Sequence, residues 1–208
     1  MTPRRRRDAT RVQRGRGGFT LVELMIAVAV FTIGVTGIIA LQQVTVVANK
    51  HSKNLALASH IAAAWIDQLT ADASLWDRSG LGNTTWLRTG AALSPAGTWF
   101  RPAWDAGRQF GPAFDALGDP IDPDSGVSPA FCTEIAVTRL YQSPSPNALM
   151  RVEVRVYWLR ESMNPATTRP AFCGGASDTP ASDVSATAAS DPTAYHFVHT
   201  ASAVRQMQ

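Results

Sequence analysis

The chain has 208 residues, which is enough for one modest domain in addition to a membrane anchor. Its formal net charge of +3 comes from the first 18 residues, which hold 7 of the 19 Lys and Arg side chains but only 1 of the 16 Asp and Glu side chains. The remaining residues therefore carry 12 basic and 15 acidic side chains, a net charge of −3, so the overall positive charge does not indicate a nucleic-acid-binding domain.

An apolar run extends from Phe19 to Leu41 and contains one ionisable side chain, Glu23, and no proline. As an α-helix, these residues would span about 34 Å, enough to cross the roughly 30 Å hydrocarbon core of a bilayer. Because the arginines precede this run, we expect a cytoplasmic N-terminus and translocation of the rest of the chain. A carboxylate in such a run is costly in lipid, which makes Glu23 a candidate functional residue; an ordinary membrane anchor or signal peptide is the alternative.

The residues that open this run are arranged unlike a secretory signal. Such a signal is cut after its apolar region, whereas here the small residues Gly17 and Gly18 precede it. The sequence Gly17-Gly18-Phe19-Thr20-Leu21-Val22-Glu23, beside a basic leader, resembles the class III signal of type IV pilins and related pseudopilins. The resemblance implies that a prepilin peptidase removes residues 1–18 by cutting between Gly18 and Phe19, and then N-methylates Phe19. It also implies that Glu23 satisfies the terminal amine of a neighbouring subunit and sets the axial register of a fibre.

Helical periodicity continues beyond the apolar run. Apolar or weakly polar residues recur at alternating three- and four-residue steps: Leu41, Val44, Ala48, His51, Leu55, Ala58, Ala62, Trp65 and Leu69. We therefore expect one helix from about Phe19 to about Asp72. Its first half, residues 19–41, would span the membrane or form a fibre core, and its amphipathic half, residues 42–75, would support a globular domain.

Two glycines, Gly34 and Gly37, lie in the apolar half, where each costs about 1 kcal/mol relative to alanine. They favour either close packing between membrane helices or melting of this segment when the helix enters a fibre, and the sequence leaves both readings open. Ala40 lies where major pilins usually carry a helix-kinking proline, which argues against a major subunit.

Residues 76–130 are rich in glycine, proline, aspartate and tryptophan and show no sustained periodicity. We expect an irregular region between helix and sheet, with its tryptophans in the core; a surface aromatic patch for a partner is the alternative. The aspartates at 115, 119, 122 and 124 suggest calcium, but they lack the remaining EF-hand positions and the terminal glutamate, and turn formation explains them better.

Strand patterns follow in residues 131–208. Segments 133–141 and 150–158 alternate apolar and polar residues, the second most clearly, and 195–205 alternates more weakly as a third strand. Residues 142–148 read as a hairpin loop, and 176–194 as an exposed, mobile loop. The predicted fold class is α+β and type IV pilin-like, with a long N-terminal helix packed against a small antiparallel sheet.

The two cysteines, Cys132 and Cys173, flank the first two predicted strands. In an oxidising compartment a disulfide is favoured, and closing a loop of about 42 residues is worth about 4 kcal/mol in the chain-entropy estimate. Free thiols and a metal pair are the alternatives, although two cysteines are too few for a structural zinc site.

No catalytic constellation is evident, so we expect a non-enzymatic protein with no cofactor and no metal centre. His196 and His199 have a weak metal-ligand spacing, but in a strand they would face opposite sides. His51 and His60 lie on the helix without an associated nucleophile.

Further segments resemble PilV-type minor pilins: Ile33 to Gln42, Leu55-Ala56-Leu57-Ala58 and Val154-Arg155-Val156-Tyr157-Trp158. This resemblance implies a minor pilin at or near the pilus tip, which helps prime assembly and supports adhesion and twitching motility. The implied partners are the major pilin, other minor pilins, a tip adhesin, the prepilin peptidase and the inner-membrane assembly platform. The implied location is the inner membrane, with a periplasmic domain, and then the cell-surface pilus. The alternatives are a minor pseudopilin of a type II secretion system, a receptor-binding tip adhesin, and a plain anchored domain.

Overall fold

The computed structural model describes residues 18–77, 80–93, 95–141, 148–160, 173 and 193–206. Most of the leader, of the predicted hairpin loop at 142–148 and of the predicted loop at 176–194 lies outside the described residues. The chain divides into two compact units, residues 1–50 and residues 51–208, each of which is considered by itself below.

The long helix α1 extends from Leu21 to Ala73 and contributes residues to both units. It begins two residues after the predicted start and ends one residue after the predicted end. The helix is continuous between these points because no proline interrupts it. Among the described residues, α1 is long and apolar enough near its N-terminus to cross a membrane, judged by length and composition.

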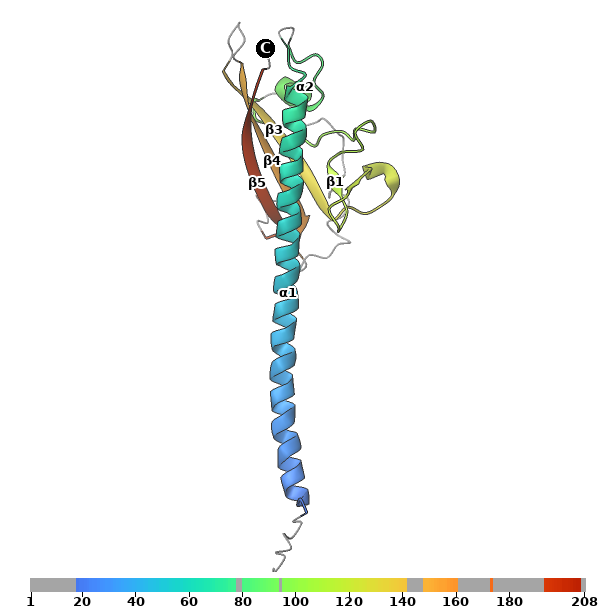
Figure 1. Ribbon diagram of the computed structural model, residues 1–208, viewed down its shortest axis with the longest axis vertical. Helices are drawn as coiled ribbons and strands as arrows, with labels where there is room; N and C mark the ends of the chain where they lie inside the picture. The colour runs from blue at the N-terminus through green and yellow to red at the C-terminus, as the bar shows by residue number, and fades with distance from the viewer. Residues whose placement is uncertain are drawn as a thin grey trace, which may run out of the picture. The chain divides into compact units, whose positions relative to one another are not determined.

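The sheet in residues 51–208 is antiparallel, with strand order β2-β1-β3-β4-β5 (Figure 1). Its three long strands are β3 (Phe131–Tyr141), β4 (Leu149–Leu159) and β5 (Tyr195–Arg205), and its two short strands are β1 (Ala113–Phe114) and β2 (Pro120–Ile121). The three predicted strands match β3, β4 and β5 to within two residues at each end. The predicted α+β, pilin-like fold is therefore confirmed.

One face of the sheet packs against the C-terminal part of α1, which runs across the long strands in Figure 1. Ala58, Ile61, Ala62, Trp65 and Leu69 of α1 are buried in the same core as the inward-facing residues of β3 and β4: Phe131, Ile135, Val137, Met150, Val152, Val154, Val156 and Trp158. The alternating pattern of β4 thus places its valines against the helix. The earlier residues of the predicted helical stripe, from Leu41 to Leu55, are exposed. The periodic pattern identifies the apolar face of the helix, but it does not show at which residue the sheet begins to cover that face.

The opposite face of the sheet has a smaller core of its own. Tyr157 is fully buried there beside Cys132, Cys173, Ala194 and Tyr195. The predicted disulfide between Cys132 and Cys173 is present, with the two Cα atoms 5.5 Å apart, and it holds Cys173 under the sheet. Both faces of the central strands are therefore covered near this bridge, which explains why three consecutive residues, 156–158, are buried.

The region between α1 and β3 contains elements that periodicity did not predict: the short helix α2 (Trp86–Ala92), β1, β2 and a 3₁₀ turn, η1 (Pro123–Ser125). The turn between β1 and β2 is closed by Asp115, whose Oδ1 accepts hydrogen bonds from the backbone N–H groups of Leu117 and Asp119 at 2.7 and 3.0 Å. This contact gives Asp115 the turn role proposed from sequence.

Helix α2 approaches β3 closely at Gly90. A Cβ atom at this position would lie 2.5 Å from Cγ2 of Val137 and 2.8 Å from a ring carbon of Phe100, so only glycine fits without displacement.

Candidate functional site

The first described residues, Gly18, Phe19 and Thr20, precede the helix and have no regular secondary structure. Phe19 is 86% exposed, and a side chain at Gly18 would meet no atom within 4 Å. The peptide bond between Gly18 and Phe19 is therefore accessible and lies outside the hydrogen-bonded helix. This is the geometry that a peptidase cutting at this bond requires.

The helix start is stabilised by the motif Thr20-Leu21-Val22-Glu23. Oγ1 of Thr20 accepts a hydrogen bond from the backbone N–H of Glu23 at 3.2 Å, and the carbonyl oxygen of Thr20 accepts one from Leu24 N–H at 3.1 Å. A threonine followed three residues later by glutamate is the capping-box sequence. Glu23 also places its negative charge in the first turn, where it complements the partial positive charge of the helix N-terminus. The Glu23 carboxylate thus stabilises the N-terminus of its own helix, in addition to any contact with a neighbouring subunit.

The N-terminal half of α1 presents large apolar side chains on all sides. Its Leu, Val, Ile, Met and Phe residues from Leu21 to Val47 are mostly half or more exposed, and no 18-residue window of this segment is buried by the rest of the chain. Apolar surface of this extent is unfavourable in water and indicates a covering by lipid or by other helices.

Three threonine hydroxyls of this segment form hydrogen bonds within the helix itself. Thr32 donates its hydroxyl hydrogen to the carbonyl oxygen of Ala29 at 2.8 Å, Thr36 to that of Ile33 at 2.9 Å, and Thr45 to that of Leu41 at 2.9 Å. Such bonds remove the cost of placing a hydroxyl in an apolar environment. Gly34 and Gly37 lie on this segment with open space around them, so the structure is compatible with close approach of another helix at either position.

The family comparison covers this segment. The prokaryotic N-terminal methylation motif matches residues 13–39, a stretch that includes the last two arginines of the leader, the Gly18–Phe19 bond, Glu23 and both helix glycines. This match supports the resemblance of the N-terminal segment to those of type IV pilins and pseudopilins. No curated protein and no solved structure matches the chain.

For a pilin-like chain, the motif has general consequences. It implies processing by a prepilin peptidase and assembly with other pilins, and the apolar helix fits membrane anchoring. Proteins of this family are generally structural rather than enzymatic. The motif covers only residues 13–39 and says nothing of the contacts within residues 51–208, called the pilin-like domain below.

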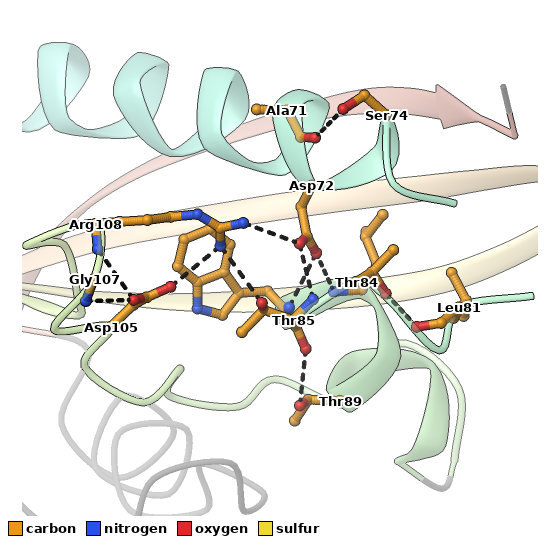
Figure 2. Close-up of polar contacts among 12 residues, drawn as sticks. Ala71, Asp72, Ser74, Leu81, Thr84, Thr85, Thr89, Asp105, Gly107 and Arg108 are labelled. Carbon is orange, nitrogen blue, oxygen red and sulfur yellow. Dashed lines mark hydrogen bonds and ion pairs between the residues drawn. The ribbon is translucent and has the colours of Figure 1, made fainter. Parts of the chain in front are cut away.

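The end of α1 is joined to α2 by a buried carboxylate, Asp72, as Figure 2 shows. Its Oδ1 accepts a hydrogen bond from the backbone N–H of Thr85 at 2.8 Å, and its Oδ2 accepts from those of Trp86 and Leu87, both at 3.0 Å. The side chain of Thr85 itself makes no capping hydrogen bond to α2. Asp72 therefore caps α2 from a distant position in the sequence and fixes the chain as it leaves α1.

A partly exposed arginine, Arg108, completes this site. Its Nη2 lies 3.9 Å from Oδ1 of Asp72, its Nη1 lies 3.3 Å from Oδ2 of Asp105, and its guanidinium lies over the ring of Trp86, 4.7 Å from the centroid. Oδ1 of Asp105 in turn accepts hydrogen bonds from the backbone N–H groups of Gly107 and Arg108. Sequence analysis did not identify this group, since its members are 13 or more residues from Asp72 and follow no motif.

The face of the sheet opposite α1 carries a second buried charge, Glu134 on β3. It forms an ion pair and a 2.6 Å hydrogen bond with Arg155 on the neighbouring strand, and its Oε1 lies 3.7 Å from Nη2 of Arg101. The hydroxyl of Tyr157 also donates to Oε1 at 3.4 Å. Burial raises the pKa of Glu134 above its ordinary value, an effect that the two guanidinium groups oppose. Burial and the nearby Glu134 likewise raise the pKa of Tyr157, which stays neutral and able to donate.

The histidines lie as their spacing predicted. His196 is on the α1 side of β5, and His199 is on the opposite side, where its Nε2 lies 3.4 Å from Oε1 of Glu153 and its ring contacts Trp99. His196 and His199 therefore do not converge on one site.

Proposed function

We propose that this chain is a minor pilin of a type IV pilus, incorporated at or near the tip, where it primes assembly with other minor pilins and supports adhesion and twitching motility. The observation that carries the proposal is the N-terminal segment: an accessible Gly18–Phe19 bond followed by a helix whose apolar surface is left uncovered by the rest of the chain. A basic leader before this segment favours insertion in the inner membrane, with the N-terminus cytoplasmic and the domain periplasmic.

Assembly depends in this proposal on Phe19 and Glu23. Cleavage after Gly18 exposes an amine at Phe19, and within a packed bundle of apolar helices an unpaired charge is costly. The carboxylate of Glu23 from one subunit satisfies the amine of the next, which fixes the axial step between subunits. Gly34 and Gly37 supply the packing or melting of the helix that fibre entry requires.

A minor rather than a major subunit is favoured by Ala40, through which α1 continues without a break. The resemblance of Ile33 to Gln42 and of Val154 to Trp158 to PilV-type proteins points the same way. The alternative that shares the N-terminal segment is a minor pseudopilin of a type II secretion system; a receptor-binding tip adhesin is the second alternative.

Deletion and complementation in the source organism test this proposal. Loss of the gene is expected to reduce surface fibres and twitching while leaving export of secreted proteins intact, and the wild-type copy restores both. A copy with Glu23→Leu is expected to be processed at Phe19 but not to restore fibres, whereas Glu23→Asp, which keeps the charge, restores them in part. Loss of protein export with intact fibres would instead indicate the secretion pseudopilus.

A further inference from the structure

Two imidazoles from distant parts of the sequence lie in contact in the pilin-like domain. His51 on α1 and His196 on β5 have their ring centroids 4.7 Å apart, with the ring planes inclined at 51°. Trp158 on β4 stacks against His196 at 5.2 Å and lies 6.5 Å from His51, so it forms one wall of the pair. No sequence pattern indicates this pairing, because only the packing of α1 on the sheet brings these residues together.

The ring nitrogens of this pair are available. Within the described part of the chain, neither His51 nor His196 forms a hydrogen bond or an ion pair through its imidazole. His51 is exposed and His196 is half-buried, so small solutes reach both rings. By contrast, His199 on the other face of the same strand is engaged by Glu153.

The separation of the rings fits a shared metal ion. With metal–nitrogen bonds of about 2.1 Å, each imidazole centroid lies about 3.2 Å from the ion. Two such rings are then about 4.5 Å apart for a right angle at the metal and about 5.2 Å apart for a tetrahedral angle. The observed 4.7 Å lies within this range.

The charge around this site bears on the choice of ion. The positive charge of Arg160 acts on His196 and repels a cation, so ions with a strong preference for imidazole are favoured over hard ions that prefer oxygen ligands.

We propose that His51 and His196 form a two-imidazole site for a divalent transition-metal ion (Cu²⁺, Ni²⁺ or Zn²⁺), with water completing the coordination. The bound ion joins α1 to the last strand of the sheet. Because both ligands come together only in the folded domain, binding stabilises that domain in proportion to the ion concentration.

Titration of the purified full-length chain in detergent, carrying an affinity tag free of histidine, tests the proposal. Isothermal calorimetry with Cu²⁺, Ni²⁺, Zn²⁺ and, as a hard-ion control, Mg²⁺ is expected to give one transition-metal ion per chain and no Mg²⁺ binding. His51→Gln and His196→Gln are each expected to weaken binding at least tenfold. The matched controls, His60→Gln on the exposed side of α1 and His199→Gln on the opposite sheet face, are expected to bind as the wild type does.

A second readout separates ligation from folding. Electron paramagnetic resonance of the Cu²⁺ complex is expected to show coupling to two imidazole nitrogens, which falls to one in either His51→Gln or His196→Gln. The proposal is overturned if no transition metal binds, if either variant retains wild-type affinity, or if the His199→Gln control loses binding equally.

Discussion

The buried carboxylate of Asp72 offers the sharpest test of how this domain is held together. Replacement by alanine removes the acceptor of three backbone N–H groups, those of Thr85, Trp86 and Leu87, at 2.8–3.0 Å. Trp86 and Leu87 are buried, so water does not replace the lost bonds without rearrangement of α2.

The magnitude follows from these contacts. At roughly 1 kcal/mol for each orphaned donor, Asp72→Ala is expected to lower the free energy of unfolding by about 3 kcal/mol. Asp72→Asn keeps one acceptor oxygen and is expected to cost about half as much. Arg108→Ala is expected to cost about 1 kcal/mol or less, because its ion pair with Asp72 is long at 3.9 Å and the arginine is partly exposed.

Urea unfolding of the full-length chain in detergent, followed by tryptophan fluorescence, measures these differences. Trp86 and Trp65, whose ring centroids are 5.2 Å apart, lie in the core beside this cap and report on its loss. Asp67→Ala is the matched control, since Asp67 is exposed on the same helix. The reasoning is refuted if Asp72→Ala stays within 0.5 kcal/mol of wild type, about the scatter expected of an unimportant surface change. It is also refuted if Arg108→Ala is as damaging as Asp72→Ala.

Three further predictions concern the sheet and α2. Replacing Cys132 and Cys173 by serine together is expected to lower the free energy of unfolding by about 4 kcal/mol, measured in urea, and reduction of the wild type should have the same effect. Because burial raises the pKa of Glu134, the folded chain holds this proton more tightly than the unfolded chain. The contribution of Glu134 to stability is therefore greatest below its ordinary pKa and falls as pH rises through the raised value. This pH dependence of the free energy of unfolding should disappear in Glu134→Gln. If the variant shows the same pH dependence as the wild type, the effect does not come from Glu134. Gly90→Ala is expected to destabilise the domain by about 1–3 kcal/mol, as overpacked sites do, whereas Gly82→Ala, where a Cβ meets no atom within 4 Å, should have little effect on the thermal midpoint.

Much of the fold followed from periodicity. The bounds of α1 and of β3, β4 and β5 were predicted closely, because each has a sustained helical or alternating pattern and a partner surface that the pattern requires. The opposite orientations of His196 and His199 followed from strand geometry in the same way. The helical stripe predicted too much packing, since its members before Ala58 are exposed.

The polar contacts of the domain were not predictable by these means. Asp72 reads as one more acid near a helix end, and nothing in the sequence connects it with the N-terminus of α2. Glu134 lies on the face of β3 opposite α1, and nothing in the sequence indicates that it is buried or that Arg101 and Arg155 lie beside it. His51 and His196 likewise meet only through tertiary packing. These contacts join residues that are far apart in the sequence, so no local sequence pattern indicates them.

The N-terminal segment differs from these tertiary contacts, because its local residue order was sufficient for the prediction. The order Gly18-Phe19 followed by Glu23 indicated processing and assembly, and the methylation motif matches the same residues. The structure adds the capping contact of Thr20 and the exposure of the helix that follows.

The most direct test of this account is mass spectrometry of the N-terminal peptide, on sheared surface fibres and on membranes from the same cells. The account predicts N-methylated Phe19 in washed fibres, absent when the major pilin is deleted. A processed Phe19 terminus confined to membranes would contradict incorporation into a pilus and favour the secretion pseudopilus. An intact Met1 terminus in both fractions would contradict the prepilin interpretation itself.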